Sequence, residues 1–245
     1  MDQVPDEFAA ELVTNVEGAI ATITLSRPEI GNALTRAMMI RLAKHVGTLS
    51  AQPDVRVLVL AAAGDEFCRG RDGRGESRAG MSPYDVRAHL MGGLLSVFDA
   101  IAQAPIPLVA CVQGPTNNFG VTLAAACDIT LASDKATFRY AEIEQGTPPT
   151  TAISVLTPNV SAKALAYLIY GAKSFDAQQA LRCGLVTDVF PHDRFSDEAR
   201  AFIKKLAETP RIALESIKRF QTRAAALTPD MRAEYAIALR ALAGS

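Results

Sequence analysis

Apolar residues in the first third of the chain change from a strand-like to a helix-like spacing and back. Residues 19–25 form a short β-branched run that ends before Pro28, which predicts a strand followed by a turn. Residues 35–50 carry apolar side chains at helical spacing after Thr35, a favourable N-cap residue, and therefore predict an amphipathic helix. Residues 55–62 are almost entirely apolar, which is typical of a strand covered on both faces.

The same alternation continues through the rest of the chain, after a loop at 64–82 that carries arginines among several glycines. The further elements predicted are, in order, a helix at 86–102, a buried strand at 107–112, a turn at 114–120, a short apolar helix at 121–127, a strand at 129–132, an edge strand from 137, and helices at 161–170, 177–182, 198–208 and beyond. Paired strands followed by helices predict an α/β fold with a helical C-terminal part, in one domain with a helical extension.

Composition and charge narrow the classes of partner. The 245 residues are 49% apolar and 21% charged, as in an ordinary globular protein. The net charge of −1 argues against a nucleic acid or an anionic membrane as the main partner. No apolar run approaches the length of a membrane span. The acidic N-terminus has no apolar stretch and the four cysteines lack CxxC spacing, so we expect a cytoplasmic protein with reduced thiols.

Several segments match, in order, the motifs of one known family. They are Ile-Thr-Leu-Ser-Arg-Pro at 23–28 with Asn-Ala-Leu at 32–34, Val-Arg-Val-Leu-Val-Leu at 55–60 with Phe-Cys-Arg-Gly-Arg-Asp at 67–72, Pro-Leu-Val-Ala-Cys-Val-Gln-Gly at 107–114, Leu-Ala-Ala-Ala-Cys-Asp-Ile at 123–129, then Phe138, Glu142-Ile143, Gly146, Gly171, Ala177, Ala180 and Gly-Leu-Val at 184–186. Together these segments cover residues 20–190 and resemble the enoyl-CoA hydratase/isomerase (crotonase) family.

The resemblance implies a fold, a substrate class and an assembly. The expected fold is a crotonase-like α/β spiral of repeated ββα units over residues 1–190. A helical C-terminal region at 191–245 is expected to pack on this core and at a trimer interface. The expected partner is an acyl-CoA thioester, with coenzyme A as part of the substrate and without a metal or redox cofactor. The resemblance also implies a homotrimer or a hexamer.

The resemblance further implies two backbone N–H groups that bind the thioester carbonyl oxygen. Enolisation places negative charge on this oxygen, and one preorganised donor commonly contributes about 2.7–4 kcal/mol. Residue by residue, the donors fall on the backbone of Arg71 and of Phe119. Asn118-Phe119-Gly120 stands where the family has three glycines, so the phenylalanine side chain is expected to crowd the thioester or to reshape the acyl pocket.

Only one of the family's two acid–base glutamates is present. The first glutamate position is Thr122 and the second is Glu142. Because a threonine hydroxyl does not ionise usefully near neutral pH, Thr122 can bond a water but cannot share the proton transfers of hydration. A single carboxylate suits the movement of a proton from C2 to C4 of a 3-enoyl thioester, so we favour isomerisation with Glu142 as proton shuttle. Nearby Glu144 lies outside the matched position and is expected to be solvated.

The expectations for coenzyme A are less specific. An arginine-rich loop at 69–78 would suit a phosphate-bearing ligand, although it is also explained as a merely charged loop. The stretch 148–152, Pro-Pro-Thr-Thr-Ala, replaces glycines of the family and predicts a stiffer turn. The matched segments assign the coenzyme A side of the site to Arg27, Arg69, Gly70, Asp72 and Gly120.

Three functions therefore stand at this point. The first is an enoyl-CoA isomerase or hydratase-like enzyme. The second is another enolate-forming reaction of an acyl-CoA, such as decarboxylation or carbon–carbon cleavage. The third is a non-catalytic acyl-CoA-binding homologue, which binding of a thioester without turnover would favour.

Overall fold

The computed structural model describes residues 10–74 and 79–243. Its main sheet has six strands in the order β1-β2-β3-β4-β6-β9, and a smaller sheet has the order β5-β7-β8. The strands are β1 (Leu12–Glu17), β2 (Ile20–Leu25), β3 (Val57–Ala62), β4 (Leu108–Val112), β5 (Thr116–Asn117), β6 (Ile129–Ser133), β7 (Thr137–Arg139), β8 (Phe175–Asp176) and β9 (Asp188–Phe190).

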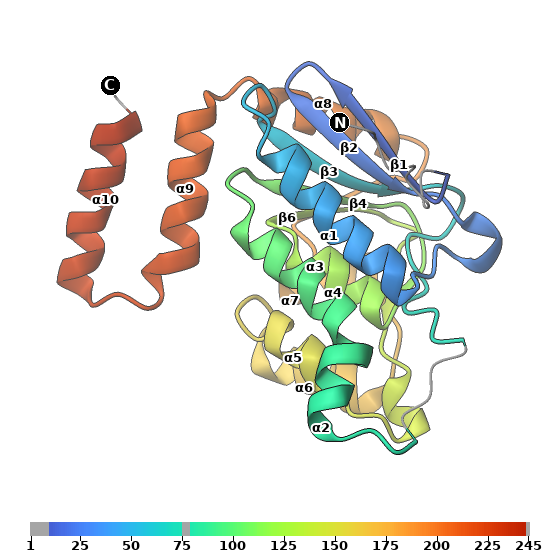
Figure 1. Cartoon of the computed structure of the whole chain (residues 1–245). Helices are drawn as coiled ribbons and strands as arrows, with labels where there is room; N and C mark the ends of the chain where they lie inside the picture. Colours follow the sequence, from blue (N-terminus) through green and yellow to red (C-terminus); the bar gives the residue numbers. More distant parts are fainter. Residues whose placement is uncertain (1–9, 75–78, 244–245) are drawn as a thin grey trace, which may run out of the picture.

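Helices cover both faces of the main sheet (Figure 1). The α-helices are α1 (Arg36–Ser50), α2 (Pro83–Asp85), α3 (Gly92–Gln103), α4 (Phe119–Ala126), α5 (Thr150–Leu156), α6 (Ala162–Gly171), α7 (Ala177–Cys183), α8 (Phe195–Ala207), α9 (Arg211–Ala224) and α10 (Pro229–Ala243). Shorter helical turns are the 3-10 helices η1 (Pro28–Ile30) and η3 (Glu142–Gln145) and the π-helix η2 (Val86–Met91).

The main sheet is parallel except at one edge. β1 and β2 form an antiparallel hairpin, whereas β2, β3, β4, β6 and β9 pair in parallel. Parallel strands need helices on both faces, and their sequences are therefore apolar throughout. The sequence of β3, Val-Leu-Val-Leu-Ala-Ala, follows this rule, since its first four residues are all buried. The predicted α/β fold is confirmed.

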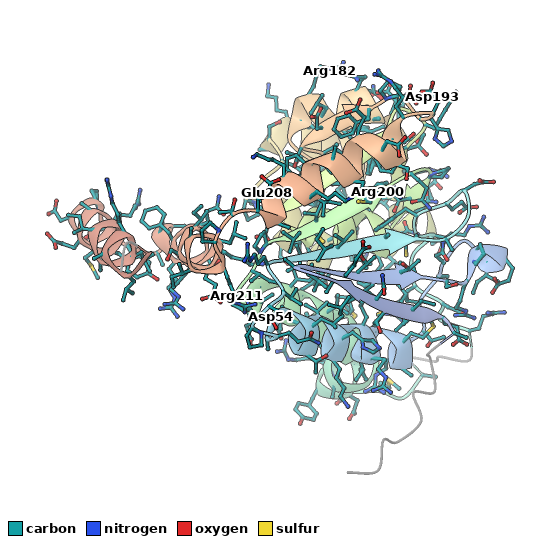
Figure 2. All side chains as sticks on the ribbon, turned by 90° about the horizontal axis from the view of Figure 1, so that it is seen from above. Asp54, Arg182, Asp193, Arg200, Glu208 and Arg211 are labelled. Carbon is teal, nitrogen blue, oxygen red and sulfur yellow. The ribbon has the colours of Figure 1, made fainter. Side chains whose placement is uncertain are left out.

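Two hydrophobic layers lie on opposite sides of this sheet. α1 and α3 pack together over one face, where Leu42 of α1 and Val97 of α3 join the large core. α8 covers the other face, where Phe195 and Ile203 pack against Val57 and neighbouring strand residues. Figure 2 shows α8 lying across the sheet, with Arg200 and Glu208 marking its course.

The last two helices stand apart from the sheet as an antiparallel pair (Figures 1 and 2). The start of α9 is fastened by Arg211, whose guanidinium donates to the backbone carbonyls of Ser50, Gln52 and Val55. Further along α9, the buried Lys218 ammonium lies 2.7 Å from Asp128 Oδ2 and also donates to the carbonyls of residues 101 and 106. α10 packs against α9. The predicted trimer interface in this region stays a prediction.

One predicted turn is a helix. The stretch at 148–152 was expected to form a stiff turn, but α5 begins at Thr150 and runs to Leu156. Proline fits the entrance of a helix, because its missing N–H is one that the first turn would leave without an intrahelical acceptor. Pro148 and Pro149 therefore precede α5 rather than prevent it. The two-residue strands β5 and β8 were not predicted individually, since such short pairings have no periodicity of their own.

Among the described residues, no helix is both long enough and apolar enough to cross a membrane.

Candidate active site

A cavity of about 540 Å³ opens where the loops after β3 and β4 meet the segment after β7. In parallel sheets, ligands commonly bind beyond the carboxyl ends of the strands. A larger groove of about 880 Å³ lies between the sheet and α8, but it contains none of the predicted catalytic residues. The smaller cavity is lined by all four of them, namely Arg71, Phe119, Thr122 and Glu142. We therefore place the candidate active site there.

The loop that carries Arg71 runs beside the strand that leads into α4. Cys68 forms a parallel bridge with Thr116, and the Asn117 N–H donates to the Cys68 carbonyl at 3.0 Å. Gly70, with φ of 121°, lies so close to this strand that a Cβ atom there would be 3.2 Å from the Asn117 carbonyl oxygen. This close approach brings Arg71 and Phe119 to the same cavity although they are far apart in sequence.

Phe119 is the first residue of α4. The first N–H groups of a helix have no acceptor within the helix, and the helix dipole favours negative charge there. Gly120 follows under tight packing, since a Cβ atom at this position would lie 2.2 Å from the Cys68 carbonyl oxygen. The Phe119 side chain is buried, and its ring centroid lies 5.8 Å from that of Phe98. The phenylalanine thus forms part of the cavity wall together with α3.

The turn before α4 has an unusual backbone. Asn118 has φ of 51° and ψ of −119°, a conformation that glycine adopts readily and other residues rarely do. Such a conformation costs about 1–3 kcal/mol and persists only where its surroundings enforce it. The Asn118 N–H donates to the Arg139 carbonyl at 2.8 Å, and its side-chain Oδ1 accepts from the Ala141 N–H at 2.9 Å. The turn is therefore bound to the segment that leads to Glu142.

Glu142 begins the 3-10 helix η3, which is capped at its C-terminal end by Gly146 in a left-handed conformation. The Glu142 carboxylate is half-buried and lines the cavity. Burial raises its pKa above the ordinary value for a glutamate, while the positive charge of Arg71 opposes this shift. A carboxylate with a raised pKa is a stronger base than a solvated one. By contrast, Glu144 is exposed and pairs with Arg139 at 2.8 Å, as expected of a solvated side chain.

Thr122 lines the same cavity, but its hydroxyl is hydrogen-bonded to the hydroxyl of Tyr140. Its Oγ1 lies 2.7 Å from the Tyr140 hydroxyl, and both side chains are almost fully buried. Burial raises the pKa of the Tyr140 phenol, and the nearby Glu142 charge acts in the same direction. The Thr122–Tyr140 pair is therefore neutral at physiological pH. Neither hydroxyl of this pair ionises readily, in contrast to the Glu142 carboxyl group.

None of the five residues predicted to contact coenzyme A lines this cavity. Gly70 and Gly120 are the two close-packed glycines described above. Arg69 pairs with Glu66, and Asp72 is shared between Arg74 at 2.7 Å and Arg27 at 3.7 Å. The hydrogen bond from Arg74 is the main reason that the pKa of Asp72 falls to about 2. Arg78 lies outside the described residues.

Some cavity residues were not found from the sequence. Met91, Leu94 and Phe98 form an apolar wall, and their spacing of three and four residues is a helical signal that was available. Tyr140 does not line the cavity but bonds to Thr122 behind it. It lies two residues before Glu142, which is the spacing of one face of an extended chain. The role of the Asn118 side chain left no signal, because it depends on a backbone conformation and on a distant partner.

Comparisons with known proteins concern the family and the fold. A family model described as enoyl-CoA hydratase/isomerase matches residues 15–240. Enoyl-CoA delta isomerase 2 of Rattus norvegicus is 34% identical over 229 residues, which cover 89% of this chain and 56% of that relative. This chain therefore spans little more than half the length of that isomerase.

Solved structures share the fold over nearly the whole chain. An enoyl-CoA hydratase of Mycobacterium smegmatis has a TM-score of 0.87 and 31% identity, covering 94% of this chain and 90% of that chain. A putative enoyl-CoA hydratase from Thermobifida fusca, solved in complex with CoA, has a TM-score of 0.83 and 26% identity, covering 95% and 92%.

Proposed function

Because the chain belongs to the enoyl-CoA hydratase/isomerase family, we propose that it moves the double bond of a 3-enoyl-CoA thioester to the 2-position. The observation that carries this proposal is that Glu142 supplies the one carboxylate among the described residues that line the cavity. Arg71 and Phe119 line the same cavity, while the Thr122 position holds a neutral hydroxyl pair. One base and two oxyanion donors are what a proton shift through an enolate requires.

In the proposed reaction, Glu142 removes a proton from C2 of the thioester. The electrons of the C2–H bond form a dienolate whose negative charge rests on the carbonyl oxygen. Arg71 and Phe119 donate their backbone N–H groups to this oxygen. The same carboxyl group then delivers the proton to C4, so that the double bond lies between C2 and C3 and the base is regenerated. The proposed reaction needs no redox cofactor, because the substrate undergoes no net oxidation or reduction. It needs no metal, because the two backbone N–H groups stabilise the enolate oxygen.

Two features of the cavity support Glu142 in this role. Burial raises its pKa, which increases its basicity for the first transfer. The apolar wall of Met91, Leu94 and Phe98 offers a surface for the hydrocarbon part of an acyl chain. Hydration fits the cavity less well, since it also requires a second group that exchanges a proton near the water, and the Thr122 hydroxyl is bonded to Tyr140.

For the coenzyme A part, we propose that the mouth of the cavity near the loop 66–74 receives the nucleotide. The CoA complex of the Thermobifida fusca relative supports a CoA ligand for this family member. Arg27, Arg69 and Arg74 are paired with carboxylates, so phosphate binding would draw on guanidinium groups that already have partners.

A non-catalytic acyl-CoA-binding role is the second candidate. It is favoured by Phe119, because a phenylalanine replaces glycine at the proposed oxyanion donor. The test is to combine the purified protein with a 3-enoyl-CoA, with crotonyl-CoA and with acetoacetyl-CoA. Isomerisation with little hydration supports the proposal. Tight binding of acetoacetyl-CoA without turnover of either enoyl-CoA would replace it by the binding role, and turnover of crotonyl-CoA alone would replace it by hydration.

We further propose a homotrimer or a hexamer. The α9–α10 pair exposes several large apolar side chains, among them Ile217, Met231 and Ile237, and exposed apolar surface of this kind marks association sites. Light scattering at micromolar concentration is expected to give three or six times the 26.1 kDa of one chain. A mass of one chain would contradict this assembly.

A further inference from the structure

Asn118 binds the backbone on both sides of Tyr140. Its N–H donates to the Arg139 carbonyl at 2.8 Å, and its side-chain Oδ1 accepts from the Ala141 N–H at 2.9 Å. The two bonds use one backbone group and one side-chain group of a single residue. Asn118 is thereby clamped to the segment that continues directly into η3.

The two neighbours of this clamp are the groups proposed to act on the substrate. Phe119, the next residue after Asn118, begins α4 and lines the cavity. Glu142, the next residue after Ala141, begins η3 and lines the cavity. A single side-chain hydrogen bond therefore joins Asn118 to Ala141. The proposed oxyanion donor and the proposed base are the residues that directly follow these two.

The backbone of Asn118 shows that this arrangement is enforced. Its φ of 51° and ψ of −119° suit glycine, and any residue with a side chain is strained in this conformation. What asparagine adds over glycine is the carboxamide, whose Oδ1 reaches the Ala141 N–H. Asn118 itself lines the cavity.

We propose that Asn118 is a positioning residue, whose side chain fixes the Glu142 carboxylate relative to the Phe119 N–H. This inference rests on the proposed function, because it assigns a geometry to the same two groups. Proton transfer is sensitive to such geometry, and a displacement of about 1 Å can lower a rate by about a hundredfold. Substrate affinity depends much less on the position of the base.

The decisive variant is Asn118→Gly. Glycine adopts the observed φ and ψ without strain, so the fold should be retained and the thermal stability should not fall, while the acceptor for the Ala141 N–H is lost. We expect kcat for the 3-enoyl-CoA to fall by about tenfold to a hundredfold. KM should stay nearly unchanged. Amide hydrogen exchange of Ala141, followed by NMR, should become faster than in the wild type.

Asn118→Asp is the matched counterpart. Its carboxylate still accepts from the Ala141 N–H, so exchange at Ala141 should stay slow. Because a second negative charge beside Glu142 disfavours the charged form of Glu142, the acid limb of the pH profile should move to higher pH. At pH values above this limb, kcat should recover to near the wild-type value, because the acceptor for the Ala141 N–H is retained. A loss of kcat as large as in Asn118→Gly would contradict the inference.

Three further results would overturn the inference. They are a wild-type kcat in Asn118→Gly, a rise in KM with unchanged kcat, and unchanged exchange at Ala141. If the wild type turns over no enoyl-CoA at all, the proposed function fails and the catalytic role of Asn118 fails with it. Ala141 exchange then still decides whether the side chain holds the segment, so the two failures are distinguishable.

Discussion

The two sides of the cavity carry polar side chains of different kinds. On the α4 side, Thr122 is 2% exposed and its hydroxyl is closed by the Tyr140 hydroxyl at 2.7 Å. On the η3 side, Glu142 is half-buried, and the nearby charge of Arg71 offsets part of the rise in its pKa. In the proposed reaction, the chemistry of this cavity therefore depends on the position that can change charge, and not on the number of polar groups.

The largest expected effect comes from removing the group that ionises. Glu142→Gln keeps the shape and hydrogen bonding of the side chain but removes the base. The isomerisation rate should fall at least about a hundredfold while binding of acetoacetyl-CoA stays nearly unchanged. Glu144→Gln is the matched control, since Glu144 is exposed and pairs with Arg139 outside the cavity. Comparable loss in both variants would show that Glu142 is not the base.

The next test gives the α4 side of the cavity a carboxylate like the one on the η3 side. Thr122→Glu places a second carboxylate opposite Glu142, and combination with Tyr140→Ala opens the volume that the buried ring now fills. The double variant should hydrate crotonyl-CoA at least about tenfold faster than the wild type, because a second acid–base group becomes available. Thr122→Val serves as the control and should gain no hydration. If the double variant binds CoA thioesters but gains no hydration either, the neutral side chain at position 122 does not determine which reaction occurs.

The α4 side is expected to depend on close packing. Gly120→Ala introduces a Cβ atom 2.2 Å from the Cys68 carbonyl oxygen, so backbone must move. Overpacking of this kind costs about 1–3 kcal/mol, and each kcal/mol lowers Tm by about 2–4 °C in a chain of this size. Gly47→Ala on α1 is the control, because a Cβ atom there meets nothing within 4 Å. Equal thermal stability of the two variants, measured by calorimetry, would contradict a packing role for Gly120.

The smallest expected effect concerns the positive charge of Arg71, which lowers the pKa of Glu142. Because burial raises the pKa of Glu142, the acid limb of kcat/KM should lie above the ordinary range of a glutamate, with activity rising as the carboxylate forms. Arg71→Met removes the opposing positive charge and should move this limb to still higher pH. Arg69→Met should leave it in place, since Arg69 pairs with Glu66. A limb that moves to lower pH in Arg71→Met would contradict the assignment to Glu142.

The sequence predicted the parts of this molecule that depend on local pattern. The amphipathic helix at 35–50 appears as α1, Arg36–Ser50, and the apolar run at 55–62 contains β3, Val57–Ala62. The family motifs led to Arg71, Phe119, Thr122 and Glu142, which the structure brings to one cavity. Their chemical roles stay predictions until they are tested.

What the sequence did not predict depends on partners that are distant along the chain. The Asn118 side chain reaches Ala141 only because its backbone has a glycine-like conformation. The arginines of the loop 69–74 have charges that suit a phosphate, yet Arg69 and Arg74 lie in ion pairs with Glu66 and Asp72. Composition counts these charges but does not show which of them are already paired.

The order of strands in the main sheet has a consequence for how the protein folds. Arg71 follows β3, Phe119 follows β4 and β5, and Glu142 follows β7. The residues that line the cavity therefore come from loops after several different strands. Each parallel pairing requires closure of a long loop before its contacts form, and such non-local topologies fold slowly. The cavity therefore cannot form before these strands have paired. During refolding, recovery of activity is expected to trail the recovery of helical structure, because the helices form from local contacts and the cavity does not.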